Sequence, residues 1–158
     1  MTRVGQGYDV HPFAAGRRLV LGGVTFAGET GLAGHSDGDV ATHAVIDALL
    51  GAAALGDIGS HFPASDAHLR DADSIDLLHQ VAKLVAAAGF RVGNVDLTVV
   101  AERPRIAPRV AEMRQRLAAA LAVDTARVSV KATTTDGLGA IGRGEGIAAL
   151  AVALLDEA

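Results

Sequence analysis

The stretch of residues 35–59 constrains the fold most, because a polar, glycine-containing start passes there directly into an apolar helical pattern. Ser36 is a good N-cap residue, and Asp39 lies three positions later, where an acidic partner is common near a helix N-terminus. The helical pattern ends at Gly56, and a tight loop follows. We therefore expect one central helix, with its N-cap at Ser36, around which the rest of the chain is organised.

Two polar side chains interrupt the apolar pattern of this helix. His43 and Asp47 are four residues apart, so both project from one helix face. Asp47 could accept the second imidazole N–H of a metal-bound His43 and fix its tautomer, although an ordinary polar residue at a helix boundary fits equally well. A histidine near the polar start and the closing turn Asp57-Ile58-Gly59 suggest a site rather than plain packing.

Length, charge and cysteine content narrow the class of protein. A chain of 158 residues is long enough for one domain, residues 1–158, with a core that needs no disulfides. The net charge of −4 argues against a general nucleic-acid binder, and the absence of cysteine fits a reducing compartment. The first ten residues lack a secretory signal, and the longest apolar stretch, residues 146–155, is too short for a bilayer. We expect a cytoplasmic protein without a membrane partner.

The remaining pattern predicts an α+β domain with a mixed β-sheet and helices packed on one face. A polar loop over 60–71 is long enough to act as a lid. Pro12 is expected to stop regular pairing of the first strand. Residues 147–155 fit either a helix or a buried strand. Strands are expected over 3–11, 18–21, 24–26, 92–102 and 127–133, and further helices over 73–88 and 108–121.

Three residues have the chemistry of a metal site. Asp9 and His11 are two apart and share a face of the expected strand, and His43 lies on the central helix. Two imidazoles and one carboxylate leave a fourth tetrahedral position open, as in catalytic zinc sites. Because Asp-x-His is a common pattern and His43 is distant in sequence, capping or an ordinary polar contact remains the alternative for His43.

The loop over 133–139 offers hydroxyls, backbone N–H groups and the carboxylate of Asp136 directly after a strand. Such a loop suits phosphate oxygens together with a divalent ion, although a solvated turn has the same composition. Arg143 lies between glycines, where its charge could approach a phosphate or a neighbouring subunit, or simply face solvent.

Four blocks of sequence, in order and at matching spacing, resemble the 2-C-methyl-D-erythritol 2,4-cyclodiphosphate synthase family of non-mevalonate isoprenoid biosynthesis. The resemblance spans essentially the whole chain. It implies conversion of 4-diphosphocytidyl-2-C-methyl-D-erythritol 2-phosphate to the cyclodiphosphate and CMP by metal-assisted intramolecular phosphoryl transfer. The blocks are Gly7-Tyr8-Asp9-Val10-His11, residues 35–59, Lys131-Ala132-Thr133-Thr134-Thr135 and Gly142-Arg143-Gly144-Glu145-Gly146.

The resemblance also implies roles for the polar residues. It assigns Zn²⁺ to Asp9, His11 and His43. It assigns a second divalent cation, Mg²⁺ or Mn²⁺, to Asp136 and the substrate diphosphate, at a position where the family usually has glutamate. By the same resemblance, His35 and Thr134 stabilise and align the transition state.

Further substrate contacts are implied for three groups of residues. Arg105 replaces the usual lysine near the diphosphate, which keeps the charge but not the shape. Ala140 stands where the family often has phenylalanine. The methylerythritol contacts are Ser36, Asp57, Ile58 and Gly59; the flexible cover is Phe62, Pro63, Ala64, Ser65 and Asp66; the cytidine and diphosphate side is Ala101, Pro104, Arg105, Ile106, Ala107, Ala132, Thr133, Thr134, Thr135 and Asp136. Ala140 and Arg143 are implied to lie toward the three-fold axis of the family's trimer, where an apolar channel can hold an isoprenoid diphosphate.

The family forms homotrimers around inward-facing sheets, which implies active sites between adjacent subunits. The metal side would come from one chain and the cytidine side from its neighbour. Two other functions use the same ligands: a zinc-dependent phosphohydrolase with water as nucleophile, and a non-catalytic trimeric module with a structural metal. The products distinguish them, since only the synthase releases CMP from the cytidylyl substrate.

Overall fold

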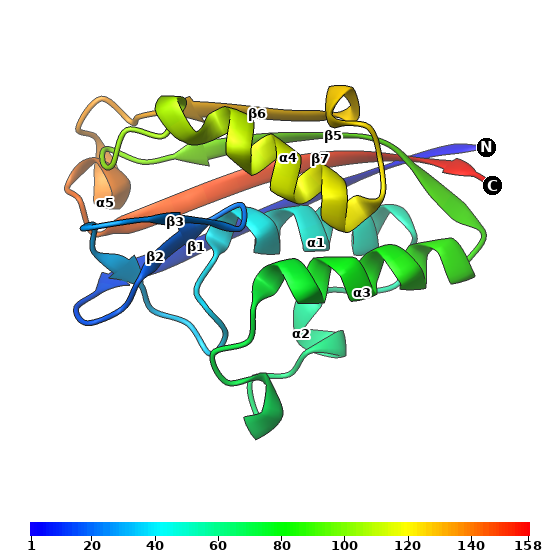
Figure 1. Cartoon of the computed structure of the whole chain (residues 1–158), viewed down its shortest axis with the longest axis horizontal. Coiled ribbons are helices and arrows are strands. Elements are labelled where there is room, and N and C mark those ends of the chain that lie inside the picture. The colour runs from blue at the N-terminus through cyan, green and yellow to red at the C-terminus, as the bar shows by residue number, and fades with distance from the viewer.

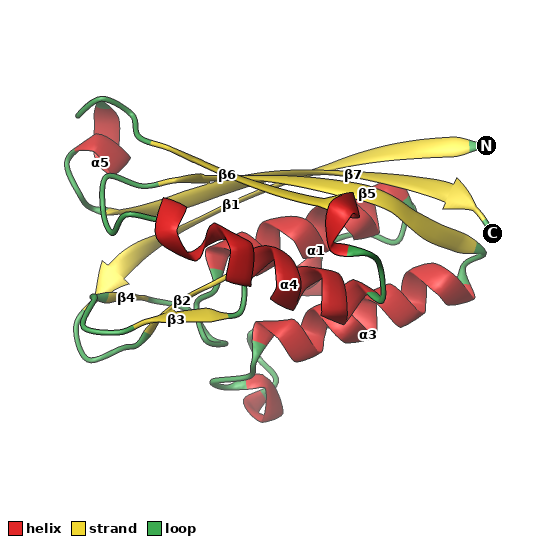
Figure 2. Ribbon diagram, turned by 45° about the horizontal axis from the view of Figure 1, so that its top comes forward, coloured by secondary structure: helices red, strands yellow, loops and turns green.

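The computed structural model describes residues 1–158, and its centre is a five-stranded sheet with helices on one face (Figures 1 and 2). Strands β5 and β6 are parallel and the other neighbours antiparallel, which confirms the predicted mixed sheet. The strand order is β4 (Gly31–Leu32), β1 (Thr2–Ala14), β7 (Gly146–Glu157), β5 (Phe90–Val100) and β6 (Val128–Thr133). The other elements are hairpin β2 (Leu19–Leu21) and β3 (Val24–Phe26), helices α1 (Val40–Ala52), α3 (Ser74–Ala87) and α4 (Val110–Leu121), and short helices α2 (Ile58–His61) and α5 (Gly139–Gly142).

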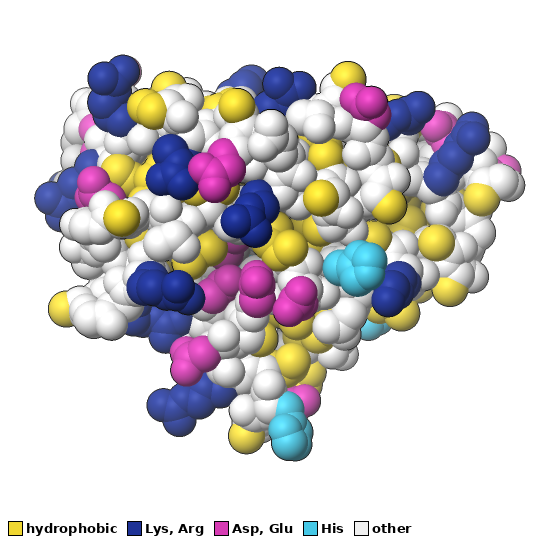
Figure 3. Space-filling model, in the orientation of Figure 1, with side chains coloured by type: hydrophobic (Ala, Val, Ile, Leu, Met, Phe, Trp, Pro, Cys, Tyr) yellow, Lys and Arg dark blue, Asp and Glu magenta, His cyan; other side chains and the backbone are white.

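The helices form the layer that buries the sheet. Helix α1 lies against β1 and β7, α4 lies against β6, and α3 contacts both helices. The predicted helices over 73–88 and 108–121 are confirmed as α3 and α4, because their apolar stripes at helical spacing face this core. Figure 3 shows acidic and basic side chains interspersed on the face that carries α3 and α4. None of the helices combines the length and apolar character that crossing a bilayer requires.

The first strand is longer than predicted, and the prediction that Pro12 ends its pairing is wrong. Pro12 lies in register with Gly146 of β7. Its carbonyl accepts a hydrogen bond from the Ala33 N–H (2.9 Å), and the next N–H, of Phe13, donates to the Glu145 carbonyl (3.0 Å). Because proline removes only one donor, the strand continues to Ala14.

Residues 147–155, which fitted either a helix or a strand, belong to the central strand β7. Ala149, Ala151 and Ala153 point into the core, whereas Leu150 and Val152 are partly exposed on the other face. This period of two is that of a strand. The small inward side chains leave room for α1 to lie close to the sheet.

The closest approach of helix to sheet depends on two glycines of β1. A Cβ atom at Gly5 would lie 2.0 Å from the Ala48 carbonyl oxygen, and one at Gly7 would lie 1.9 Å from the Ala44 carbonyl oxygen. Only glycine can therefore occupy these positions while α1 keeps its place. The contact brings the first turn of α1 alongside the end of β1 that carries Asp9 and His11.

The N-cap of α1 is Asp39, so the prediction of Ser36 as the N-cap is wrong. The Asp39 carboxylate accepts the Thr42 N–H at 3.0 Å and the N–H groups of Gly22 and Gly23 at 2.8 Å each. It is fully buried. These bonds join the turn of the β2–β3 hairpin to α1, whereas the Ser36 hydroxyl faces His43 (3.0 Å).

The outer face of the sheet has no covering layer (Figure 2). Large apolar side chains are exposed there on the two adjacent strands β1 and β7: Val4, Tyr8, Val10, Leu150 and Val152. We call these five residues the outer apolar face. An exposed apolar surface of this kind commonly marks a protein–protein contact.

We expect Gly7→Ala to lower the free energy of unfolding by about 3 kcal/mol, the upper part of the usual range for overpacking, because the new methyl group meets helix backbone rather than a flexible side chain. The measurement is urea denaturation at one fixed protomer concentration.

The matched control is Gly51→Ala in α1, where the nearest atom to the new Cβ is 4.0 Å away. That change should leave stability unchanged or raise it by up to about 1 kcal/mol. Equal effects of the two substitutions would contradict the steric explanation.

Candidate active site

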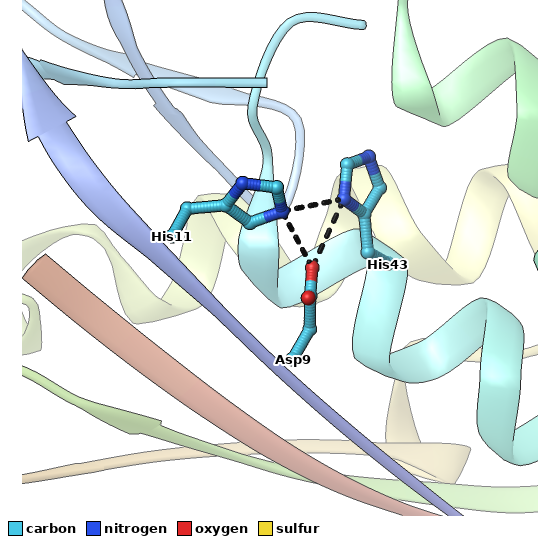
Figure 4. A group of neighbouring side chains, drawn as sticks. All are labelled: Asp9, His11 and His43. Carbon is cyan, nitrogen blue, oxygen red and sulfur yellow. Dashed lines mark hydrogen bonds and ion pairs between the residues drawn. The ribbon is translucent and has the colours of Figure 1, made fainter. Parts of the chain in front are cut away.

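Three side chains from β1 and α1 converge at one point, as predicted (Figure 4). His11 Nε2 lies 2.8 Å from Asp9 Oδ2, and His43 Nδ1 lies 3.1 Å from the same oxygen. The two imidazole nitrogens are 3.3 Å apart. The alternation of the strand puts Asp9 and His11 on the helix-covered face, and the first turn of α1 supplies His43.

This triangle of donor atoms fits one small divalent ion. In a tetrahedral zinc site with bonds of 2.0–2.1 Å, ligand atoms are about 3.3 Å apart. The three separations in the triad, 2.8, 3.1 and 3.3 Å, are close to that spacing. Two imidazole nitrogens and one carboxylate oxygen are also a donor set that zinc accepts.

Each imidazole is oriented by its second nitrogen. His11 Nδ1 donates to the Ala33 carbonyl oxygen (2.6 Å), which leaves Nε2 facing Asp9. His43 Nε2 lies 2.8 Å from the Ser74 hydroxyl, which leaves Nδ1 facing the same carboxylate. Sequence reasoning missed both partners, because one is a backbone carbonyl and the other a serine distant in the chain.

Asp47 does not contact the His43 imidazole, so the prediction that it fixes the tautomer is wrong. Its carboxylate accepts the Ile58 N–H at 2.7 Å instead. Asp47 therefore holds the start of α2, the helix that follows α1 beside the cavity.

Hydrogen bonding within the triad shifts the pKa values of its members. Burial, the strongest single influence on Asp9, acts to raise the pKa of its carboxyl, but hydrogen bonds from His11 and His43 outweigh burial and hold that pKa at about 2. The hydrogen bond to Asp9 raises the pKa of His11 against the opposing effect of burial. The proton that His11 shares with Asp9 therefore competes with a metal ion, and metal binding must release it.

A cavity of about 270 Å³ opens beside the triad. The structure brings several predicted contact residues to its wall, together with two leucines that sequence reasoning did not single out. His35 is held through its Nε2, which donates to the Asp66 carbonyl oxygen at 2.8 Å. Besides the triad, the wall consists of His35, Ser36, Ile58, Gly59, Phe62, Ala64, Leu69 and Leu77.

Four predicted residues near this cavity do not line it. Asp57 caps α2 by accepting the Ser60 N–H at 2.9 Å. Pro63 and Ser65 are exposed beside it, and Asp66 contributes its carbonyl to His35 and its carboxylate to the His68 N–H (2.9 Å). The segment contains α2 and a 3₁₀ turn rather than a loop without regular structure.

The predicted cytidine-side residues form a second, separate pocket of about 170 Å³. It shares no residue with the first cavity. Thr134 lines it, so one expected transition-state residue lies with this group and the other, His35, with the triad. The wall consists of Ala101, Glu102, Pro104, Arg105, Ile106, Ala107, Ala132, Thr133 and Thr134.

Glu102, which sequence reasoning missed, holds the loop beside this second pocket. One carboxylate oxygen accepts the N–H groups of Thr135 (3.0 Å) and Gly137 (3.3 Å). These bonds lower the pKa of Glu102. Asp136 lies exposed between them with a left-handed backbone (φ 53°), and its carboxylate contacts the Thr134 hydroxyl (3.3 Å).

Ala140 and Arg143 line neither pocket. Ala140 is exposed on α5, and Arg143 follows that short helix. The Arg143 guanidinium is paired with the Glu145 carboxylate at 2.7 Å on the surface.

Comparisons with known proteins place the chain among proteins of one family. The YgbB family model matches residues 2–156. A 2-C-methyl-D-erythritol 2,4-cyclodiphosphate synthase from Moorella thermoacetica is 60% identical over 153 residues, which are 97% of this chain and 94% of that protein. A bifunctional enzyme IspD/IspF from an Anaeromyxobacter species is 62% identical over 152 residues, which are 96% of this chain but only 39% of that protein.

Solved structures are similar over the whole fold. The bifunctional IspDF of Campylobacter jejuni superposes with a TM-score of 0.96 at 42% identity, covering 100% of this chain and 43% of that one. A CDP complex of Plasmodium falciparum IspF superposes with a TM-score of 0.86 at 33% identity, covering 99% and 96% of the two chains. The chain thus spans about two fifths of its bifunctional relatives and nearly all of the single-function ones.

The contact between Asp9 and His11 predicts how the pKa of His11 depends on the carboxylate. We expect Asp9→Asn to lower the pKa of His11 from its raised position to below the ordinary histidine value, because the carboxylate is removed and burial remains. NMR titration of the His11 imidazole in chelator-treated protein measures this.

The same raised pKa sets the sign of the stability effect. The His11–Asp9 interaction should stabilise the ion-free protein while Asp9 is ionised and His11 is protonated. This contribution should be lost as the pH rises through the raised pKa of His11, and also as the pH falls through the Asp9 pKa of about 2. Asp76→Asn, in the first turn of α3, is the control and should leave the His11 titration in place. An unchanged His11 titration in Asp9→Asn would exclude the carboxylate as the cause.

Proposed function

The chain belongs to the YgbB family, that of 2-C-methyl-D-erythritol 2,4-cyclodiphosphate synthase, and on this premise we propose how its two pockets perform the family's reaction. The substrate is 4-diphosphocytidyl-2-C-methyl-D-erythritol 2-phosphate. Its 2-phosphate attacks the β-phosphorus, the cyclodiphosphate closes, and CMP leaves. The observation that carries the proposal is the convergence of Asp9, His11 and His43 at the wall of a cavity of about 270 Å³.

The reaction needs positioning and charge neutralisation rather than a protein nucleophile. Asp9 Oδ2, His11 Nε2 and His43 Nδ1 would hold zinc. Bound there, zinc supplies a Lewis acid that polarises a phosphate oxygen and offsets its charge. The fixed orientation of both imidazoles supports this assignment, because each is held by a partner outside the donor triangle.

The residues around the cavity bind and align the methylerythritol part. Ser36, Ile58 and Gly59 contact its hydroxyls and 2-phosphate. The His35 imidazole makes a polar contact with the phosphates and aligns them as negative charge develops there. Residues 62–66 cover the substrate and exclude water, which strengthens these interactions.

The second pocket binds the cytidine end. Backbone groups of residues 104–107 read the base edge, and Arg105 offsets diphosphate charge. The Thr134 hydroxyl donates to the diphosphate. Asp136 would hold Mg²⁺ or Mn²⁺ together with the α- and β-phosphates, in the way that single carboxylates and phosphates commonly share these ions. Its exposed side chain is compatible with such a shared site.

We propose that the two pockets meet only across a subunit boundary, in a homotrimer. The separation of their wall residues within one chain supports this arrangement. The outer apolar face supplies a surface for neighbouring sheets to bury. A ring of three identical heterologous contacts would place each metal half against the nucleotide half of the next chain, with Arg143 close to the axis.

The relatives favour the synthase over the zinc-dependent phosphohydrolase and over a non-catalytic trimeric module. Each of the matched single-function proteins described above is a cyclodiphosphate synthase or its CDP complex. The direct test is to incubate the purified protein with the cytidylyl substrate and a divalent ion. Release of CMP with the cyclodiphosphate supports the proposal, whereas release of inorganic phosphate would overturn it.

We expect His43→Ala to abolish stoichiometric zinc binding and to lower CMP release by at least about a hundredfold, because even outer-sphere losses cost 10–100-fold at metal sites. Zinc content by mass spectrometry and CMP release by chromatography measure the two effects. His79→Ala on the exposed part of α3 is the control and should retain both properties. A zinc-free His43→Ala protein with full turnover would contradict the assigned role.

Complementation tests the shared site. His43→Ala and Thr134→Val chains carrying different affinity tags should each be inactive alone. Trimers containing both, isolated by tandem purification, should recover about one third of wild-type turnover, because one of the three interfaces joins two intact halves. If each site lay within one chain, the mixed trimers would remain inactive.

A further inference from the structure

We infer that Ser74 and Asp37 form a hydrogen-bonded relay that positions His43 for metal binding. Both are therefore positioning residues for the reaction, although neither touches the metal or the substrate. This inference rests on the proposed function, since it concerns the same metal centre. It deepens that proposal by identifying what holds the one ligand that does not come from β1.

The relay has two short links that end on a carboxylate. His43 Nε2 lies 2.8 Å from Ser74 Oγ, and Ser74 Oγ donates to Asp37 Oδ1 at 2.5 Å. The Ser74 N–H donates to the other oxygen of the same carboxylate at 3.0 Å. Ser74 is completely buried at the start of α3, so water cannot replace either partner.

The Asp37 carboxylate, at the end of the relay, determines where the Ser74 hydroxyl proton points. An ionised carboxylate can only accept, so the single hydroxyl proton of Ser74 points to Asp37. The Ser74 oxygen then presents a lone pair to His43, and Nε2 must carry the imidazole proton. Nδ1 is left unprotonated on the side of Asp9 and His11, which is the tautomer that a metal ligand requires.

Neighbouring backbone bonds fix the relay in place. The Asp37 N–H donates to the Ala72 carbonyl (3.0 Å), and the Asp71 N–H donates to the His35 carbonyl (2.8 Å). The Asp39 N–H donates to Asp37 Oδ1 at 3.0 Å. Two backbone bonds thus join the segment before α1 to the segment before α3, at residues 71 and 72, just before Ser74.

Ser36 is the competing partner, because its hydroxyl also lies near His43 Nε2, at 3.0 Å. That hydroxyl makes no second contact with a carboxylate, so it can rotate either to donate or to accept. Ser36 therefore does not select a tautomer, whereas Ser74 does. Loss of the Ser74 hydroxyl should consequently weaken metal binding more than loss of the Ser36 hydroxyl.

The experiment compares zinc dissociation constants, measured by chelator competition on the full-length protein. Ser74→Ala should weaken zinc binding about 10–100-fold, as outer-sphere losses at metal sites do. Asp37→Asn, which nearly preserves shape, should weaken it to a smaller extent, and Ser36→Ala less than Ser74→Ala. Asp73→Ala is the matched control, because it removes the α3 cap to the Ile75 N–H (2.9 Å) without touching the relay. It should lower the melting temperature and leave zinc affinity unchanged.

A spectroscopic readout separates positioning from general weakening. In zinc-loaded wild-type protein, ¹⁵N NMR of the histidines should show His43 protonated at Nε2, with slow exchange of that proton. Ser74→Ala should accelerate the exchange, and Asp73→Ala should not. Wild-type zinc affinity and an unchanged Nε2–H signal in Ser74→Ala and Asp37→Asn would overturn the relay while leaving the proposed function standing. Failure of the wild-type protein to bind zinc and release CMP would overturn both.

Discussion

Direct contact between the backbone of α1 and strand β1 is the constraint on which the rest of the structure depends. Gly5 and Gly7 permit it, since any side chain there would overlap the helix carbonyls. Asp9 and His11 continue the same strand face, so one strand supplies a packing surface at its beginning and chemistry at its end. The position of His43 relative to its partners is thus set by the backbone contact at Gly7, which lies two residues before Asp9 and four before His11.

The segment from Ser36 to Asp39 connects this contact to the rest of the molecule. Ser36 faces His43, Asp37 binds Ser74 at the start of α3, and Asp39 caps α1 while holding the turn of the β2–β3 hairpin. Three residues of this short segment thus hydrogen-bond to α1, to α3 and to the β2–β3 hairpin. Burial and the nearby Asp37 carboxylate raise the pKa of Asp39, yet the donors aimed at it leave no oxygen unused. A polar segment is consequently as important to the fold as the apolar core.

Local sequence patterns predict most of the helices and strands, whereas they do not identify hydrogen-bond partners that are distant in the sequence. The helices α3 and α4 and the hairpin follow from spacing within a dozen residues. The Asp9-x-His11 pattern suggests two ligands of the metal triad. Spacing alone does not decide whether His43 is the third ligand, and only the family resemblance assigns it to the same site. The errors at Ser36 and Asp47 share one cause. Both side chains were assigned the nearest plausible partner, while the folded chain offers Ser36 an imidazole and Asp47 the N–H of Ile58.

The burial of α1 has a consequence for how the protein must move. All of its residues except Asp47 and Gly51 are shielded from solvent, so the helix cannot shift without opening the whole core. Residues 57–69 have no fully buried side chain. A change in access to the cavity would therefore have to come from this outer segment rather than from α1, and the imidazole and carboxylate groups of the triad would keep their positions.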